Sequence, residues 1–298
     1  MPELPDVLLY LSALRPRVVG HAIAGIRLAS PFLLRSIDPP PAALTGHRIT
    51  AVTRLGKRIV FECEGELFAV VHLMIAGRFR WKPADAAIPA KLGLAAFDFA
   101  HGTLLLTEAG TTKRASLHLV AGREGLRLHD PGGVDVFASD LAAFVAAITS
   151  ENRTLKRILT DPHVLDGIGN AYSDEILHAA RLSPFKQTRA LNQEEMVRLH
   201  DACRRVLSEW TARLQQATGD AFPEKVTAFR PEMAVHGRYR QACPVCGTPV
   251  QRVVYAANEA NYCPTCQTDG RLLADRSLSR LLKDDWPRTL EELEQRRR

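Results

Sequence analysis

Four cysteines near the end of the chain have the spacing of a metal site. Cys243-Pro-Val-Cys246 and Cys263-Pro-Thr-Cys266 form two C-x2-C pairs separated by sixteen residues. Four thiolates at this spacing suit tetrahedral Zn²⁺, and they leave no open position for a catalytic water. We therefore expect one structural Zn²⁺ that holds a β-hairpin, with disulfides or free thiols as the alternative. Gly247 follows the first pair, where such a turn needs a permissive backbone.

The first residues could supply a nucleophile. Pro2 is small, so removal of Met1 is expected to expose a secondary amine. An α-amino group has a pKa of about 8, which leaves a useful fraction neutral near neutral pH. A neutral amine can attack the C1′ carbon of a sugar and form a Schiff base, while Glu3 shuttles protons between the opening sugar and a leaving base. A frayed, solvated terminus is the alternative interpretation.

The segment that must position this terminus is rich in short strands. From about residue 18 to 127, β-like segments recur with turn signals between them, including expected hairpins at 58–73 and 97–107. Repeated short strands of this kind predict a sandwich or a flattened barrel. Apolar residues at helical spacing predict a short helix over 3–15.

The character of the chain changes after 130–133, the expected linker, because apolar residues then recur at helical spacing. Helices are predicted over 139–149, 155–159, 171–180 and 193–216. Asn192 with Glu195 resembles a capping pair, and Thr289 with Glu292 forms a capping box near the C-terminal end. Four domains are expected, with ranges 1–130 (catalytic), 131–235 (helical), 236–270 (zinc finger) and 271–298 (charged extension).

Composition limits the class of protein. The net charge is +6 and the pI is about 9.1, which is compatible with a polyanionic partner but does not establish one. No apolar run reaches the roughly 18 residues of a membrane span, and the N-terminus does not resemble a secretion signal. We expect a cytoplasmic protein, associated with the nucleoid if it is bacterial. Cys63 and Cys203 are isolated in the sequence and are expected to be small buried hydrophobic residues.

Together these features resemble the formamidopyrimidine-DNA glycosylase / endonuclease VIII family. The segment Met1–Asp6, Lys57, the segment Asp161–Glu175 and the cysteine pairs occur in the family's order over residues 1 to about 267. The resemblance implies a multidomain α+β protein: an N-terminal β-sandwich, a helix–two-turn–helix domain and a zinc-finger β-hairpin, with DNA between them. It also implies a bifunctional enzyme that removes a base from damaged double-stranded DNA and cleaves the strand by β-elimination. We expect a monomer.

The resemblance assigns roles to several residues. It makes Pro2 the nucleophile, Glu3 the acid/base and Lys57 a DNA-phosphate contact that assists the chemistry. Asn170 follows a glycine turn and opens a helix, where backbone amides such as that of Gly169 suit a phosphate. The resemblance implies that Asn170 clamps the phosphate beside the flipped nucleotide, and an Asn N-cap is an alternative that is compatible with this role.

The loops that fill the duplex after base flipping depart from the family pattern. The position of the family's void-filling methionine is occupied by Ile75, with Met74 one place earlier, and either apolar side chain could wedge between bases. The second loop lacks the family's aromatic wedge and base-reading arginine, which leaves Lys113 or Arg114 as substitutes. Opposite-base preference therefore cannot be carried over from the family.

The finger and the neighbouring segments also differ from the family. Asn258 replaces the hairpin-tip arginine that grips phosphates, so δ-elimination is not predicted. With the shorter segment 218–230 as well, 8-oxoguanine specificity is not predicted. Arg252 or the terminal Arg296–Arg298 could compensate. Asp6 replaces a glutamate, and the segment 218–230, in the place of a lesion-capping loop, is shorter.

Two other functions remain open on the sequence alone. The first is a protein on the same fold that binds damaged DNA but has lost excision, which the changed loops and finger favour and the retained Pro2, Glu3 and Lys57 oppose. The second is a zinc-ribbon protein with an RNA or protein partner. The leading prediction is a DNA glycosylase with abasic-site lyase activity.

Overall fold

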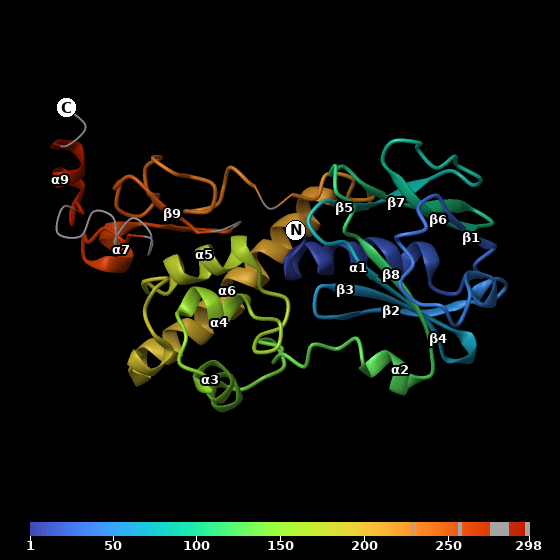
Figure 1. The fold of residues 1–298 in the computed structure, drawn as a ribbon, viewed down its shortest axis with the longest axis horizontal. Coiled ribbons are helices and arrows are strands. Elements are labelled where there is room, and N and C mark those ends of the chain that lie inside the picture. Colours follow the sequence, from blue (N-terminus) through green and yellow to red (C-terminus); the bar gives the residue numbers. More distant parts are fainter. Residues whose placement is uncertain (228, 256–257, 275–285, 296–298) are drawn as a thin grey trace. The chain divides into compact units, whose positions relative to one another are not determined.

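The chain divides into two compact units, which are coloured by sequence in Figure 1. The computed structural model describes residues 1–227, 229–255, 258–274 and 286–295. One unit contains Met1–Gly132 with Ser208–Ala228, and the other contains Gly133–Leu207 with Phe229–Arg298. The four domain ranges expected from the sequence stay a prediction.

The first unit contains the β-sandwich that the sequence pattern favoured. Its two four-stranded sheets have the strand orders β1-β6-β7-β5 and β2-β3-β4-β8, and all their paired strands are antiparallel. The strands are β1 Gly25–Leu28, β2 Ile49–Leu55, β3 Arg58–Cys63, β4 Leu67–His72, β5 Gly77–Lys82, β6 Gly93–Phe99, β7 Gly102–Glu108 and β8 Ser116–Ala121. Short helical segments connect them: η1 Pro41–Leu44, η2 Glu64–Glu66 and α2 Arg123–Arg127.

Both predicted hairpins are confirmed. Strands β3 and β4 pair from Cys63 opposite Leu67, and strands β6 and β7 pair from Phe99 opposite Gly102. A side chain at Gly102 would place its Cβ 2.3 Å from the ring of Trp81, so glycine is required where the second hairpin turns beneath that ring.

The predicted N-terminal helix is confirmed as α1, Leu4–Val18. Its apolar face joins the core between the sheets, and Tyr10 lies edge-on to Phe79 with ring centroids 5.6 Å apart. The backbone N–H of Phe79 donates to the hydroxyl of Tyr10 at 3.3 Å, which satisfies the polar end of a fully buried ring. Packing and this hydrogen bond fix α1, and with it the start of the chain.

The second unit contains the predicted helices. They are α3 Leu141–Thr149, α4 Leu155–Thr160, α5 Asn170–Ala179 and α6 Gln193–Thr218, whose last part belongs to the first unit, with η3 Thr188–Ala190 before α6. The expected capping pair is reciprocal: the Glu195 N–H donates to the side chain of Asn192 at 2.9 Å, and the Asn192 N–H donates to Glu195 at 3.0 Å.

The zinc-finger segment folds as a hairpin followed by a short helix. Its elements are β9 Gln251–Tyr255, β10 Asn258–Tyr262 and α7 Pro264–Thr268, and β9 pairs with β10 in antiparallel register.

Nearer the C-terminal end, Thr289 caps α9 Leu290–Gln295 through the N–H of Glu292, as its capping box predicts. The terminal Arg296–Arg298, proposed as a compensating basic end, lies outside the described residues. Among the described residues, no helix has both the length and the apolar character to cross a membrane.

Burial shifts the pKa of an isolated cysteine and of a histidine in the first unit. Cys63 and Cys203 are buried as predicted, and burial raises the pKa of the Cys63 thiol to about 12. His72 ends β4 opposite Arg58. Burial, followed by the positive charges of Arg58 and Lys57, lowers the pKa of His72 to about 4.

His72 should therefore make the fold sensitive to acid. Because its folded pKa lies below the unfolded value near 6.5, the unfolded chain takes up a proton first, and the free energy of unfolding falls as pH decreases from 6.5 towards 4. The shift corresponds to about 3 kcal/mol at most. Urea unfolding of His72→Gln over this pH range should show a shallower decline than the wild type. An identical decline in both proteins would refute the assignment.

Candidate functional site

The first turn of α1 holds the predicted nucleophile and acid. Pro2 is buried, Glu3 is only 2% exposed, and Asp6 is fully buried. Asp6 accepts the backbone N–H of Glu3 at 3.0 Å, as the third helical residue of a reciprocal cap. Asp6, one methylene shorter than the glutamate of the family pattern, therefore fixes the backbone of Glu3.

Charges around the terminus act on its amine. In this chain the amine is that of Met1, and burial lowers its pKa, with Glu3 opposing this effect and Arg78 adding to it. The charge of Lys57 also lowers this pKa. Lys57 lies on the two-residue turn between β2 and β3, where Gly56 supplies a positive φ of 61°. A terminal amine, a carboxylate and two cations thus lie within electrostatic reach of one another.

Arg78 is a residue of this cluster that the sequence reasoning missed. Its guanidinium donates to the carbonyls of Val226 at 2.5 Å and Gly77 at 2.6 Å, so its place depends on a segment almost 150 residues away. Val226 is itself buried in the core of the sandwich. An arginine at the start of a strand carries no local signal that could have indicated this contact.

The loop before β5 presents the predicted apolar wedge. Ile75 is 54% exposed, whereas Met74 is half-buried and holds a positive φ of 51°. The N–H of Gly77 closes the loop on the carbonyl of Leu73 at 2.9 Å, and a Cβ at Gly77 would lie 2.3 Å from that oxygen. Tight closure of this loop turns Ile75 outwards.

A buried carboxylate organises the second loop. Glu108, 1% exposed at the end of β7, accepts the backbone N–H groups of Arg114 and Ala115 at 2.9 and 3.1 Å. Lys113 donates to the carbonyl of Glu108, so it folds back on the loop, while Arg114 is exposed. Of the two cations proposed from the sequence, Arg114 is the one whose side chain faces solvent.

The glycine turn before α5 leads directly into the first turn of that helix. Gly169 is the N-cap of α5, and Asn170 is its first helical residue. The alternative in which Asn170 caps the helix is therefore wrong, because Gly169 holds the N-cap position and Asn170 lies one residue inside the helix. Gly167 has a positive φ of 78°, as the sharp turn requires. The backbone N–H groups at the start of a helix are a suitable place for an anion.

The four predicted cysteines converge. Their sulfurs all lie within 4.8 Å of one another, with separations of 3.3 Å for Cys246–Cys263, 3.5 Å for Cys246–Cys266 and 3.9 Å for Cys243–Cys266. Tetrahedral bonds of about 2.3 Å to one Zn²⁺ place sulfurs about 3.8 Å apart, so the donor set fits the ion. Gly247 adopts the expected positive φ, 76°.

A histidine from α5 supports this cluster. His178 is buried, and its Nε2 lies 3.3 Å from the sulfur of Cys243. Burial lowers the pKa of His178, and a neutral imidazole can still donate one N–H to a thiolate. Hydrogen bonds of this kind orient metal ligands and stabilise their negative charge. The sequence reasoning missed His178, since it lies 65 residues from Cys243.

The finger hairpin carries Arg252, one of the cations that could compensate for the missing arginine. The backbone of Asn258 starts β10 opposite Tyr255. Arg252 on β9 donates to Glu259 at 3.4 Å and stacks on the ring of Tyr239 at 4.8 Å. Arg252 is thus partly neutralised by a carboxylate, although its side chain remains 41% exposed.

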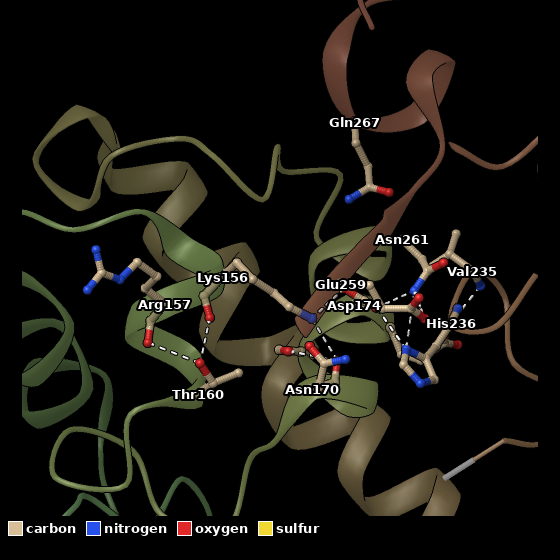
Figure 2. Close-up of polar contacts among 12 residues, drawn as sticks. Lys156, Arg157, Thr160, Asn170, Asp174, Val235, His236, Glu259, Asn261 and Gln267 are labelled. Carbon is tan, nitrogen blue, oxygen red and sulfur yellow. Dashed lines mark hydrogen bonds and ion pairs between the residues drawn. The ribbon is translucent and has the colours of Figure 1, made fainter. Parts of the chain in front are cut away.

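A buried polar network lies behind the start of α5 and was also missed. Lys156 on α4 and Asp174 on α5 form an ion pair of 2.5 Å that is almost fully buried (Figure 2). The next residue, Glu175, accepts three backbone N–H groups. Two adjacent acids in the predicted helix give only a weak signal of buried partners, since most acidic residues are exposed.

Comparison with known proteins covers most of the chain. Residues 1–130 match the formamidopyrimidine-DNA glycosylase N-terminal domain, 133–220 its H2TH domain, and 240–268 the zinc finger found in FPG and IleRS. Formamidopyrimidine-DNA glycosylase from Thermus thermophilus is 34% identical over 279 residues, which covers 91% of this chain and all of the relative.

Two further matches extend the comparison. An uncharacterized formamidopyrimidine-DNA glycosylase-like protein from Mycobacterium tuberculosis is 43% identical over 165 residues, 55% of this chain and all of that protein. The crystal structure of Lactococcus lactis Fpg with DNA containing an abasic site aligns with a TM-score of 0.78 at 25% identity, covering 89% of this chain and 99% of that one.

The β-sandwich, the helical domain and the cysteine site define a zinc-finger protein of the Fpg fold, with one structural zinc ion. The chain belongs to the formamidopyrimidine-DNA glycosylase / endonuclease VIII family.

Removal of the Asp6 carboxylate should loosen the first turn. Asp6→Ala leaves the buried N–H of Glu3 without its acceptor, which should lower the free energy of unfolding by about 1–3 kcal/mol. Asp6→Asn keeps an oxygen acceptor and should lose less. Urea denaturation of the three proteins checks this order, and equal stability of Asp6→Ala and wild type would contradict it.

Removal of the His178 donor should weaken zinc binding. His178→Phe keeps a buried ring but loses the hydrogen bond to Cys243, so zinc affinity should fall about 10–100-fold. Competition with a chromogenic chelator measures the affinity. Cys203→Ala, which removes a buried thiol outside the cluster, serves as control and should keep wild-type affinity. Unchanged affinity in His178→Phe would exclude the supporting role.

Proposed function

We propose that this chain is a base-excision-repair DNA glycosylase that also cleaves the strand at the abasic site it creates. Family membership over three matched regions supports the glycosylase activity. The Lactococcus lactis relative was solved with abasic-site DNA, which supports damaged double-stranded DNA as the partner. The observation that carries the lyase activity is the buried terminus, where an amine lies among Glu3, Arg78 and Lys57.

The chemistry follows from an amine in that environment. After removal of Met1, the Pro2 nitrogen attacks C1′ of the damaged nucleotide, and the base leaves with the electron pair of the glycosidic bond. Glu3 transfers protons between the opening sugar and the departing base. The resulting Schiff base acidifies the C2′ proton, whose loss expels the 3′ phosphate by β-elimination, and water then releases Pro2.

The surroundings of the terminus favour the reactive form of the amine. Burial lowers the pKa of the terminal amine, which in this chain is that of Met1, and the positive charges of Arg78 and Lys57 act in the same direction. We propose that the same surroundings act on the Pro2 amine once Met1 is removed. A lower pKa increases the neutral fraction at neutral pH, and only the neutral amine is nucleophilic. Glu3 opposes this shift, but its proximity is what allows it to transfer protons.

DNA contacts are proposed on separate elements. The first turn of α5, which starts at Gly169 and Asn170, is proposed to bind the phosphate beside the flipped nucleotide, as the family resemblance implies. Ile75, the exposed residue of its loop, is proposed to fill the space that the flipped base leaves, and Arg114 to face the opposite strand. Asn258 supplies no cation, so strand cleavage is proposed to stop after β-elimination.

Changes in the loop and in the finger position that the family resemblance links to DNA contacts favour a second function. Loop 109–115 has no aromatic residue, and Asn258 stands where the family resemblance implies an arginine. A damaged-DNA-binding protein that has lost excision would retain the fold and these departures. A monomeric state and a cytoplasmic location, expected from the sequence, remain part of the proposal.

Covalent trapping tests the lyase mechanism. Borohydride should reduce the Schiff base and link the protein to abasic duplex DNA, and intact mass should show that the trapped protein lacks Met1. Preparations that retain Met1 should not trap, because their Pro2 nitrogen is an amide. Pro2→Gly should trap less, and Glu3→Gln should slow base release about 10²–10⁴-fold.

Two outcomes would change the conclusion. Absence of trapping by protein that lacks Met1 would exclude the Pro2 mechanism. Tight binding to lesion-containing duplexes without release of any base would select the binding protein instead.

A further inference from the structure

A fully buried carboxylate connects α5 with the zinc finger. Asp174 accepts a hydrogen bond from Lys156 at 2.5 Å, from Nδ1 of His236 at 2.8 Å and from the side-chain amide of Asn261 at 3.0 Å (Figure 2). Lys156 comes from α4, His236 from the segment before the finger and Asn261 from β10. One carboxylate thus receives donors from three separate elements.

Asn261 can act only as a donor here. Its amide nitrogen lies 3.0 Å from Asp174 and 3.0 Å from Glu259, so an oxygen at this place would face two carboxylates. Its own Oδ1 is buried without a hydrogen-bond partner in the structure described. An unsatisfied buried acceptor is unfavourable by about 1–3 kcal/mol, which offsets part of the stability that the two donated hydrogen bonds contribute.

The adjacent acid fixes the segment that carries His236. Glu175 accepts the backbone N–H groups of Ala234, Val235 and His236 at 2.7 to 2.9 Å. The imidazole of His236 also stacks on Phe229, with ring centroids 5.5 Å apart. His236 is therefore held on both its backbone and its ring, and its N–H is directed at Asp174.

The network continues to the first turn of α5. The ammonium of Lys156 donates to the backbone carbonyl of Asn170 at 2.7 Å as well as to Asp174. A buried ion pair of this kind is weak evidence for stability, since apolar residues of similar volume often stabilise as well or better. What the ion pair does supply is position: through Lys156 it holds the first turn of α5, at the carbonyl of Asn170, against α4.

We propose that His236 and Asn261 are positioning residues for DNA binding, which hold the first turn of α5 in its phosphate-binding geometry through Asp174 and Lys156. The inference rests on the proposed phosphate site at Gly169 and Asn170. Through this network the zinc hairpin contributes to DNA affinity from behind α5, in addition to any direct contact of its own tip.

A double-mutant cycle tests the coupling. The measurement is the Kd for a duplex with a stable abasic-site analogue, by fluorescence anisotropy, for wild type, Asn261→Leu, Asn170→Ala and the double variant. Each single change should weaken binding about tenfold. The double variant should bind no more weakly than Asn170→Ala alone, because both changes act on one contact. Asn261→Leu combined with Ile75→Ala, on the other unit, should give additive losses.

A matched pair at His236 separates positioning from packing. His236→Asn places an amide N–H near the position of Nδ1 and should retain affinity to within about threefold. His236→Phe keeps the ring against Phe229 but has no donor, and it should lose about as much affinity as Asn261→Leu. Zinc content and thermal midpoint, measured on every variant, identify any variant that fails to fold. If His236→Phe does not fold, the test is the comparison of His236→Asn with the wild type.

The outcomes are distinct. Additive losses of Asn261→Leu and Asn170→Ala would overturn the positioning role while leaving the proposed function intact. Equal affinity of His236→Asn and His236→Phe would overturn it as well. Wild-type affinity of Asn170→Ala would exclude the proposed phosphate site at Asn170, and the positioning role of His236 and Asn261 would then be excluded as well.

Discussion

The constraint on which the structure depends most is that buried charged side chains must be paired and hydrogen-bonded. Lys156 and Asp174 are almost fully buried, and either one alone would be strongly unfavourable inside the second unit. Their pairing requires further donors for Asp174, and these come from His236 and Asn261. Helix α5 therefore has its place only when α4 and the finger hairpin are folded around it, which makes the ion pair a constraint on three elements at once.

A related arrangement occurs at three other places in the structure. A buried carboxylate accepts main-chain N–H groups and so orders a stretch of backbone that lacks regular pairing. Asp6 does this for Glu3, Glu108 for the loop at Arg114, and Glu175 for the segment before the finger. Charged acceptors make stronger hydrogen bonds than neutral ones, and burial removes competition from water. Loops of this kind gain rigidity without a large apolar core beneath them.

The finger illustrates why such support is needed. Its own buried cluster is small, with Val235, Val250 and two of the cysteines at its centre. A segment of this size buries too little apolar surface to fold alone, so zinc supplies much of the stability. His178 then links Cys243 to α5, and Gln267 donates to the carbonyl of Leu182 at 2.9 Å. Metal binding and packing on α5 are thus parts of one structural unit.

The sequence by itself determined what depends on neighbours along the chain. The hairpins at 58–73 and 97–107, the helices, the cap of Asn192 with Glu195 and the convergence of four cysteines follow from local patterns, and the structure confirms them. The same patterns carried the family resemblance. Local hydrogen bonds and turn preferences act over a few residues, which is why a single sequence is sufficient for them.

Only the tertiary structure decided which distant groups meet. The contacts of Arg78 with Val226 and of Asp174 with Asn261 join residues 148 and 87 positions apart. It also turned Ile75 outwards, directed Arg252 towards Glu259 and made Gly169 the cap of α5. These outcomes follow from packing and from the pairing of buried charges, which depend on the whole fold and leave no periodic signal in the sequence.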